Sequence, residues 1–375
     1  MADVWLHGWL DDDHPRSLAL AAQLSVNNVV VGPSQEDAEA VRQAGLRPWV
    51  SIGAFSAAED EEDLLCRSLS GAPLMWFRSG CPNNPALRER LLHRLHELAS
   101  WDIEGIFLDG IRFASSFEGA DTFFTCTCRW CEESAAELGL SLTEMASSLA
   151  ELVDDLARLR AEDLEAAGGG LLSPIDGLPL ALTYPGVMDW LRFRALSILE
   201  AVSQVRTALE RHAPRQELAA YLFTPALAPL VGQDYTRLAP HLDIISPMIY
   251  RFGDGPACLP AEVTGLASFF REANRNTAIQ ISARFLGLET ALRPGQPLEE
   301  GMAIDALSRE ARRARARLGR DAKLVPILWL DDPNILAATA AVQAGLPDGV
   351  SFFATGTRRG EHLQAAAAYL GDRGG

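Results

Sequence analysis

The sequence has no excess of basic residues. Its 375 residues include 33 Lys and Arg against 50 Asp and Glu, which gives a formal net charge of −17. An acidic surface repels phosphate backbones and anionic lipid headgroups. We therefore expect neither nucleic acid nor a membrane surface as a partner, and the composition predicts no particular oligomeric state.

Long apolar runs are also missing. No segment approaches the roughly 20 apolar residues that a membrane-spanning helix requires. The N-terminus, Met1–Trp5, has neither the basic nor the apolar part of a signal peptide. These absences predict a cytoplasmic chain. In that compartment the six cysteines are expected to be thiols or metal ligands rather than disulfides.

Short apolar runs alternate with segments of helical periodicity along the whole chain. Such alternation is typical of βα units in a parallel sheet, and eight units close a (β/α)8 TIM barrel. The eight expected strands are Val4–Leu10, Asn28–Gly32, Pro48–Gly53, Gly105–Phe113, Leu218–Phe223, Leu242–Tyr250, Leu324–Leu330 and Gly349–Ala354. No linker or shift in composition divides the chain, so residues 1–375 are predicted to form one elaborated α/β domain.

Two additions to the barrel are expected. Residues 114–187 form an excursion after the fourth strand, with two amphipathic segments and a cysteine cluster. A ninth apolar run, Ala278–Phe285, predicts an extra βα unit after the sixth strand. An open doubly wound sheet is the alternative fold. It usually carries a Gly-rich phosphate turn after its first strand, and Gly8-Trp9-Leu10-Asp11 is not such a turn.

The cysteine pattern predicts a metal site. Cys126, Cys128 and Cys131 form a C-x-C-x-x-C cluster, and Cys81 precedes the helix that leads to the fourth strand. Loops that follow adjacent parallel strands emerge on the same face, so the four thiols can meet there. Four thiolates favour a closed structural zinc (Zn2+) site, and no H-E-x-x-H arrangement indicates a catalytic one. The alternative is a chance cluster of buried thiols. Cys66 and Cys258 have no partners by spacing.

Two carboxylates are the candidate catalytic residues. Chemistry in barrels occurs at the C-terminal ends of strands. Asp109 follows the apolar run of the fourth strand, and Asp331 follows the seventh. Asp332 is the expected helix-capping neighbour. Asp109 and Asp331 could flank a bound sugar ring, as paired carboxylates do in glycoside hydrolysis. The alternative for Asp109 is a structural ion pair with Arg112.

Further strand-end side chains suit a carbohydrate, because aromatic faces stack on sugar C–H surfaces and polar groups bind hydroxyls. The expected substrate-binding residues are His7, Trp9, Arg112, Tyr250, Arg251 and Trp329.

Several motifs together resemble bacterial glycoside-hydrolase-like barrel proteins. They are Cys81-Pro82-Asn83, the strand Phe107–Phe113, the cysteine cluster, Ser246–Tyr250 and Pro326–Asp331. The cysteine pattern is similar to that of the zinc-bearing β-galactosidase family. This resemblance implies a TIM barrel, a carbohydrate or glycoside substrate and a structural zinc ion.

The catalytic residues depart from the pattern of the β-galactosidase family and from that of amylase-like barrels. The β-galactosidase family carries Asn-Glu after strand four and a Glu at strand seven, and amylase-like barrels carry a Glu on strand five. Here strand five ends Tyr221–Pro225 without an acid, so Asp331, Glu118 and Asp234 remain candidates for the acid catalyst. A carbohydrate-binding barrel without turnover, or a lyase or isomerase on the same fold, are the alternative functions.

Overall fold

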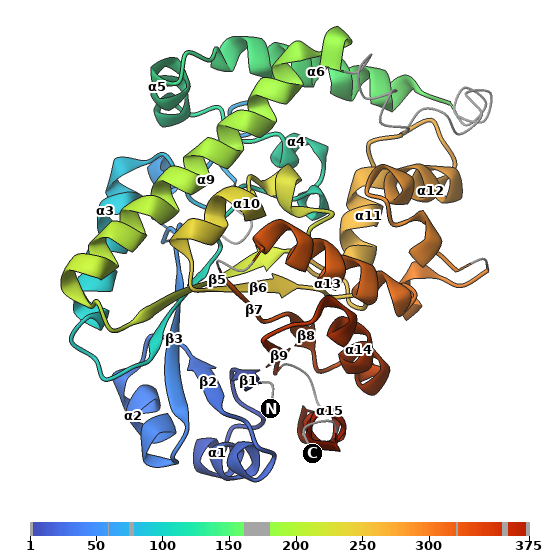
Figure 1. Cartoon of the computed structure of the whole chain (residues 1–375). Coiled ribbons are helices and arrows are strands. Elements are labelled where there is room, and N and C mark those ends of the chain that lie inside the picture. Colours follow the sequence, from blue (N-terminus) through green and yellow to red (C-terminus); the bar gives the residue numbers. More distant parts are fainter. Residues whose placement is uncertain are drawn as a thin grey trace.

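The computed structural model describes residues 3–58, 60–74, 79–160, 181–293, 295–319, 322–354 and 359–372. All of its strand pairs are parallel, and the pairing of β5 with β6 closes the sheet into a barrel (Figure 1). The strands are β1 (Asp3–His7), β2 (Asn28–Val31), β3 (Arg47–Gly53), β4 (Gly105–Asp109), β5 (Glu217–Phe223), β6 (Ile244–Met248), β7 (Lys323–Leu324), β8 (Ile327–Trp329) and β9 (Gly349–Phe353). The predicted (β/α)8 barrel is confirmed.

The strand expected at Leu324–Leu330 is divided in two. Pro326 stands between β7 and β8, and proline has no backbone N–H to offer to a ladder. Both pieces pair with β6, but only β8 continues to β9. The closed ring therefore contains eight strands, and β7 is the ninth strand, outside that ring.

The position predicted for the extra strand was wrong. Ala278–Phe285 belongs to the helix α12 (Arg275–Phe285), which begins where the Asn274 side chain accepts a hydrogen bond from the backbone N–H of Thr277. Its buried residues recur at helical spacing, and an apolar run of this length fits a helix as well as a strand. The insertion after β6 thus contains helices α11 (Leu259–Ala267) and α12 before the barrel helix α13 (Asp305–Leu318).

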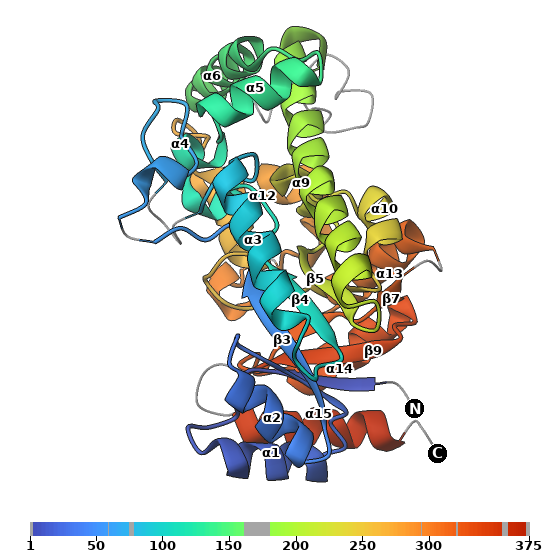
Figure 2. The same cartoon turned by 90° about the vertical axis from the view of Figure 1, so that its left-hand side faces the viewer.

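Helices surround the barrel (Figures 1 and 2). Their starts follow sequence signals: Ser34 caps one helix by accepting from the backbone N–H of Asp37, and Asn84 precedes a proline at another. The remaining barrel helices are α1 (His14–Gln23), α2 (Gln35–Gln43), α3 (Pro85–Leu98), α9 (Pro185–His212), α10 (Tyr235–Leu238), α14 (Ile335–Val342) and α15 (Arg359–Asp372). None of the described helices is long and apolar enough to cross a membrane.

The excursion after β4 forms a helical cap beside the long helix α9 (Figure 2). It contains α4 (Ala120–Phe123), α5 (Arg129–Glu137) and α6 (Leu142–Arg158). Residues 161–180 of the predicted excursion lie outside the described part of the chain. Arg194 of α9 is fully buried and donates to the backbone carbonyls of Phe123 and Thr125, which joins this segment to the barrel.

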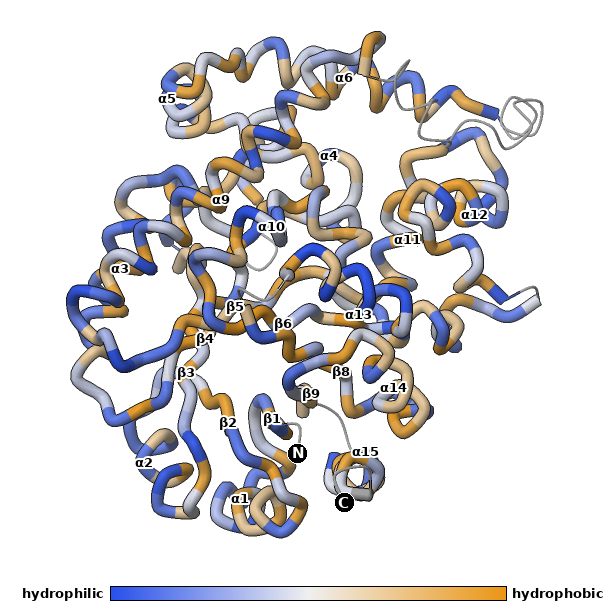
Figure 3. Tube along the Cα trace, viewed as in Figure 1, coloured by the Kyte–Doolittle hydropathy of each residue, from blue (hydrophilic) through white to orange (hydrophobic). Residues whose placement is uncertain are grey.

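The barrel has an interior core of its own, separate from the larger core between strands and helices. It contains one residue from each of the strands β1 to β6 and a residue between β7 and β8: Trp5, Val30, Trp49, Phe107, Ala219, Ile244 and Val325. The rings of Trp5, Trp49 and Phe107 contact one another in tilted or edge-to-face arrangements. The strands around this core are mostly apolar (Figure 3). This packed interior fills the barrel below its mouth, which is the end at which the C-termini of the strands lie.

Candidate functional site

A polar layer lies directly above the interior core. Side chains alternate along a strand, so a residue two positions after an inward-facing one also faces inward. Phe107 is followed in this way by Asp109 on β4, Trp5 by His7 on β1, and Ala219 by Tyr221 on β5. This alternation brings a carboxylate, an imidazole and a phenol to the C-terminal end of the barrel.

Asp109 is solvent-exposed by surface area, yet protein surrounds its carboxyl group. The resulting desolvation raises the pKa of Asp109, while the Arg112 guanidinium and the Gly110 backbone N–H lower it by smaller amounts. The carboxyl of Asp109 is thus within reach of solvent but crowded by protein, and this place at the mouth of the barrel is referred to below as the recess. Such a recess at the end of a barrel strand is where a substrate can meet a titrating group.

His7 and Tyr221 form a contact pair beside this recess. The Tyr221 hydroxyl lies within hydrogen-bonding distance of His7 Nδ1, and the Tyr221 ring stacks on Phe107 with centroids 4.7 Å apart. Burial lowers the pKa of His7 to about 3, so its imidazole is neutral. Burial and then the Asp109 charge raise the pKa of Tyr221 well above its ordinary value, so its hydroxyl is protonated.

Aromatic side chains form another part of the mouth. Tyr250, which follows β6, has its ring centroid 6.0 Å from that of Trp329 and 6.4 Å from that of Phe353. Burial raises the pKa of Tyr250, and Cys258 and then Asp109 add to the increase. Tyr250 therefore lies near enough to Asp109 for the charge of that carboxylate to act on it. Two of the predicted substrate-binding aromatics, Tyr250 and Trp329, are therefore together.

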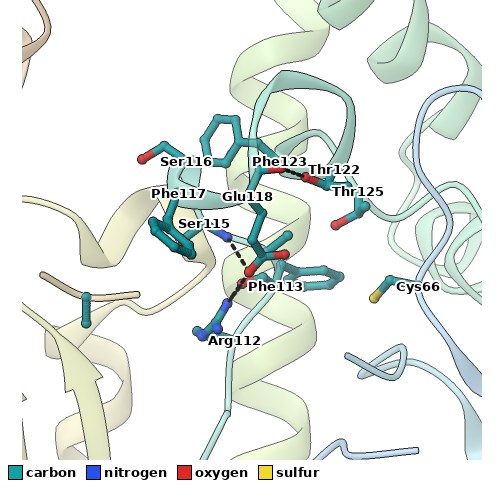
Figure 4. A network of polar contacts seen from close by, with 12 residues as sticks. Cys66, Arg112, Phe113, Ser115, Ser116, Phe117, Glu118, Thr122, Phe123 and Thr125 are labelled. Carbon is teal, nitrogen blue, oxygen red and sulfur yellow. Dashed lines mark hydrogen bonds and ion pairs between the residues drawn. The ribbon is translucent and has the colours of Figure 1, made fainter. Parts of the chain in front are cut away.

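Arg112 is paired with Glu118 rather than with Asp109 (Figure 4). Its Nη1 lies 3.2 Å from Glu118 Oε1, and its guanidinium carbon is 5.2 Å from the ring centroid of Phe223. The Glu118 side chain is 1% exposed, and burial raises its pKa against the opposing effect of Arg112. This buried pair holds Arg112 close enough to influence Asp109, and it turns Glu118 away from solvent.

Arg251 and Asp332 form a second buried ion pair. Arg251 Nη2 lies 2.6 Å from Asp332 Oδ1, and Arg251 Nη1 donates to the carbonyl of Met302. The same Asp332 oxygen accepts from the backbone N–H of Asn334. The N-cap of α14 is Asn334, so the prediction that Asp332 caps this helix was wrong, and Asp332 lies two residues before the cap. The contact joins the segments after β6 and β8 to the loop before α13.

Asp331 and Trp9 lie at other strand ends. Asp331 is half-buried between β8 and α14, and its side chain makes no hydrogen bond or ion pair with another described residue. Trp9 stacks on His14 with centroids 3.8 Å apart. Asp234, a further acid candidate, caps α10 by accepting from two backbone N–H groups. The pairing of Asp109 with Asp331 therefore stays a prediction.

The four predicted metal-ligating cysteines are together. The sulfur atoms of Cys81, Cys126, Cys128 and Cys131 all lie within 4.8 Å of one another. Cys81 Sγ is 3.4 Å from Cys131 Sγ and 3.5 Å from Cys128 Sγ. Sulfur ligands at about 2.3 Å from a tetrahedral ion are about 3.8 Å apart, so the cluster could bind a metal ion.

Two protein groups donate hydrogen bonds to the cluster, and the pKa values of its thiols diverge, because burial raises the pKa of Cys81 and that of Cys131 well above the ordinary value. The backbone N–H of Arg67 donates to Cys126 Sγ, and the Asn83 side-chain amide donates to Cys131 Sγ. Burial opposes ionisation of Cys126, but hydrogen bonds from the neighbouring thiols outweigh it, so the pKa of Cys126 lies well below its ordinary value. Cys66, for which spacing predicted no partner, also lies beside Cys126. A hydrogen bond between the two thiols raises the pKa of Cys66.

A large hollow lies away from these groups. It has a volume of about 1020 Å³ and lies between α12 and the loops that follow it. None of the predicted site residues lines it, although two of its lining residues, Gly301 and Met302, contact Arg251. The mouth of the barrel remains the place where the polar side chains converge.

Sequence reasoning missed Tyr221 and Ser51, whose side chains are hydrogen-bonded to each other. The signal was available in the alternation of β5, because Tyr221 follows the small inward-facing Ala219 by two residues. The predicted site residues stand at the ends of strands, whereas Tyr221 lies two residues before the end of β5.

The fold is a closed parallel (β/α)8 barrel with a polar layer at the C-terminal ends of its strands. No family model and no curated protein matches the sequence. Solved structures do match. A β-galactosidase from Halorubrum lacusprofundi has a TM-score of 0.58 at 13% identity, covering 98% of this chain and 58% of that one. The catalytic domain of a Paenibacillus polymyxa β-amylase has a TM-score of 0.56 at 11% identity, covering 99% and 98%.

The β-galactosidase of Marinomonas ef1 is similar at a TM-score of 0.56 and 12% identity, with 98% of this chain and 59% of that one covered. The chain thus spans less than three fifths of the length of these β-galactosidases. At such low identity the likeness shows the fold alone.

Proposed function

We propose that this protein is a glycoside hydrolase that acts on a carbohydrate at the mouth of its barrel, with Asp109 as a catalytic residue. The observation that carries the proposal is the carboxyl of Asp109 at the end of β4, which has a raised pKa and whose charge acts on Tyr221, the partner of His7, and on Tyr250. The similar solved structures include β-galactosidases and a β-amylase, whose fold supports the same class of reaction.

The chemistry follows from the charge that glycosidic cleavage develops. The transition state is oxocarbenium-like, and a carboxylate beside the anomeric carbon stabilises that positive charge or attacks it. Asp109, once ionised, takes this role. A second carboxyl group then protonates the leaving oxygen or activates water, and Asp331 is the half-buried candidate at the end of β8. Aromatic rings of Tyr250 and Trp329 offer faces for a sugar.

A panel of 4-nitrophenyl glycosides tests the proposal. The wild-type protein is expected to release nitrophenol from at least one of them, and Asp109→Asn, which keeps the shape but not the charge, to lose that activity. Asp102→Asn is a matched control, because Asp102 precedes β4, is 82% exposed and pairs with Arg42 at the surface. Activity that survives Asp109→Asn would remove Asp109 from the mechanism.

A specific observation supports carbohydrate binding without turnover as the second candidate. Glu118, another possible acid, is buried against Arg112, and Asp331 has no described contact with the other mouth residues. Binding of a sugar without release of nitrophenol from any glycoside favours this second function.

The ion that suits the cysteine cluster best is zinc. Four thiolate ligands in a tetrahedral arrangement leave no open position for water, so the site is structural. Cys81 belongs to the loop after β3 and the other three cysteines to the loop after β4, so a bound ion fixes two loops at the mouth. Six cysteines that are all free of disulfides are also consistent with a reducing, cytoplasmic location.

A further inference from the structure

Tyr221 connects the buried interior of the barrel to its mouth. Its side chain is half-buried, its ring stacks on Phe107 at an interplanar angle of 20°, and its hydroxyl contacts both His7 and Ser51. Two ring contacts of His7, with Phe107 and with Tyr221 itself, hold the imidazole in place. The phenol oxygen therefore has a fixed position beside Asp109.

His7 has two nitrogens in very different surroundings. Nδ1 faces the Tyr221 hydroxyl, whereas Nε2 is shielded from solvent and has no hydrogen-bonding partner among the described residues. A buried N–H without an acceptor is rarer and more costly than a buried lone pair without a donor. The proton of the neutral imidazole is therefore better placed on Nδ1, where the Tyr221 oxygen accepts it.

This tautomer sets the direction of the Tyr221 hydroxyl. If His7 donates from Nδ1, the phenol oxygen is the acceptor of that bond and its own O–H is free to donate elsewhere. The hydrogen bond with Ser51 lowers the pKa of Tyr221, as expected when the serine hydroxyl donates to the phenol oxygen, so it leaves the Tyr221 O–H free, and the Asp109 charge acts on the same group. Because the ring is held by Phe107 and the oxygen by His7, the O–H is oriented before any ligand arrives.

We propose that Tyr221 is a further substrate-contacting residue, which donates its O–H to a ligand oxygen beside Asp109, and that His7 is its positioning residue and carries its proton on Nδ1. The identity of that ligand as a sugar rests on the function proposed above. The tautomer of His7 does not, because it follows from contacts within the chain.

The tautomer can be measured directly by nitrogen-15 NMR on protein labelled at its seven histidines, with His7 assigned by its loss in His7→Asn. The expected result is a neutral ring protonated at Nδ1 throughout the pH range in which the protein is folded. A ring protonated at Nε2, or an imidazolium, overturns the positioning role of His7.

The role of Tyr221 is tested with the best substrate of the glycoside panel. Tyr221→Phe keeps the stacked ring and removes the hydroxyl, and is expected to lower kcat/KM by about 100-fold. His7→Asn retains an N–H donor near Nδ1 and is expected to keep much more activity than His7→Leu. Tyr184→Phe is the matched control, because Tyr184 bonds to Asp155 on the excursion.

The outcomes separate the inference from the proposed function. Full activity in Tyr221→Phe, beside an active wild type, overturns the role of Tyr221 and leaves the hydrolase intact. A wild type that neither hydrolyses any glycoside of the panel nor binds an iminosugar, a sugar analogue with nitrogen in its ring, overturns the hydrolase and the role of Tyr221 together. The NMR result still decides the tautomer in that case. Circular dichroism of each variant shows that it is folded.

Discussion

At the scale of the residue, Asp109 combines exposure with a desolvated carboxyl group. Folding raises its pKa because the surrounding protein disfavours the charged form, and Arg112 offsets this only in part. An ionised Asp109 therefore makes a negative contribution to stability at neutral pH. Active sites commonly tolerate such a cost, because the same environment prepares the group for its reaction.

The pH dependence of stability follows from this shift. Since the folded state binds the Asp109 proton more tightly than the unfolded state, stability falls as pH rises from the ordinary Asp pKa of about 4 through the higher folded pKa. Asp109→Asn, which cannot ionise, is expected to have a higher Tm than wild type at pH 7. The difference should shrink below about pH 4.

Thermal unfolding of both proteins across this pH range checks the expectation. Asp102→Asn is a suitable control, because Asp102 is 82% exposed and pairs with Arg42 at the surface. A Tm for Asp109→Asn that is below wild type at neutral pH would contradict the raised pKa.

At the scale of the element, the ion pair of Arg251 and Asp332 holds together the segments that follow β6 and β8. The two side chains are 2% and 6% exposed. Asp332→Ala leaves a buried guanidinium without its partner and is expected to reduce the free energy of unfolding by about 3–5 kcal/mol. Urea denaturation measures this change.

The double variant Arg251→Met with Asp332→Leu is compared with Asp332→Ala to separate the effect of the unpaired charge from that of the lost contacts. Replacing both charges by apolar groups of similar size removes the unpaired charge, so stability should recover much of the loss. A double variant as unstable as Asp332→Ala would show that the hydrogen bonds of Arg251 to Met302, rather than the ion pair, stabilise this junction.

The elements also show how far sequence reasoning reached. Alternation of apolar runs and helical segments predicted the barrel and the approximate position of each ring strand. It failed at Ala278–Phe285, because a short apolar run fits a buried helix as well as a strand. The cysteine spacing predicted the cluster, whereas the place of Cys66 beside it depends on the loop before Cys81, which no local pattern specifies.

The candidate site was predictable where strand ends alone define it. Asp109 and His7 are the last residues of β4 and β1, and Tyr250 follows β6 by two residues, so all three lie at the same end of the barrel. The pairing of Arg112 with Glu118 was not predicted, since it depends on the turn of the chain after β4. The alternation of side chains along β5 indicates that Tyr221 faces inward. Its contact with His7, however, joins residues 214 positions apart, which no local pattern specifies.

At the scale of the whole molecule, the cysteine cluster connects two loops and the helical excursion to the barrel. Metal analysis of the freshly purified, reduced protein is expected to find about one zinc ion per chain. Its removal by a strong chelator should lower the Tm by about 5 °C or more, because ligand binding to the folded state adds to stability.

Cys128→Ser should abolish the bound ion and reproduce the lower Tm without chelator. Cys258→Ser is the matched control, because Cys258 is a buried thiol outside the cluster. Absence of metal from the wild type, or an unchanged Tm after chelation, would sink the assignment of a structural ion.

The central claim is that a carbohydrate binds in the mouth of the barrel against Asp109. A crystal structure of Asp109→Asn with the sugar that the wild type prefers tests it most directly. We predict a sugar ring within hydrogen-bonding distance of residue 109 and of the Tyr221 hydroxyl, beside the rings of Tyr250 and Trp329. A sugar bound instead in the hollow beside α12, with the mouth left unoccupied, would contradict the account.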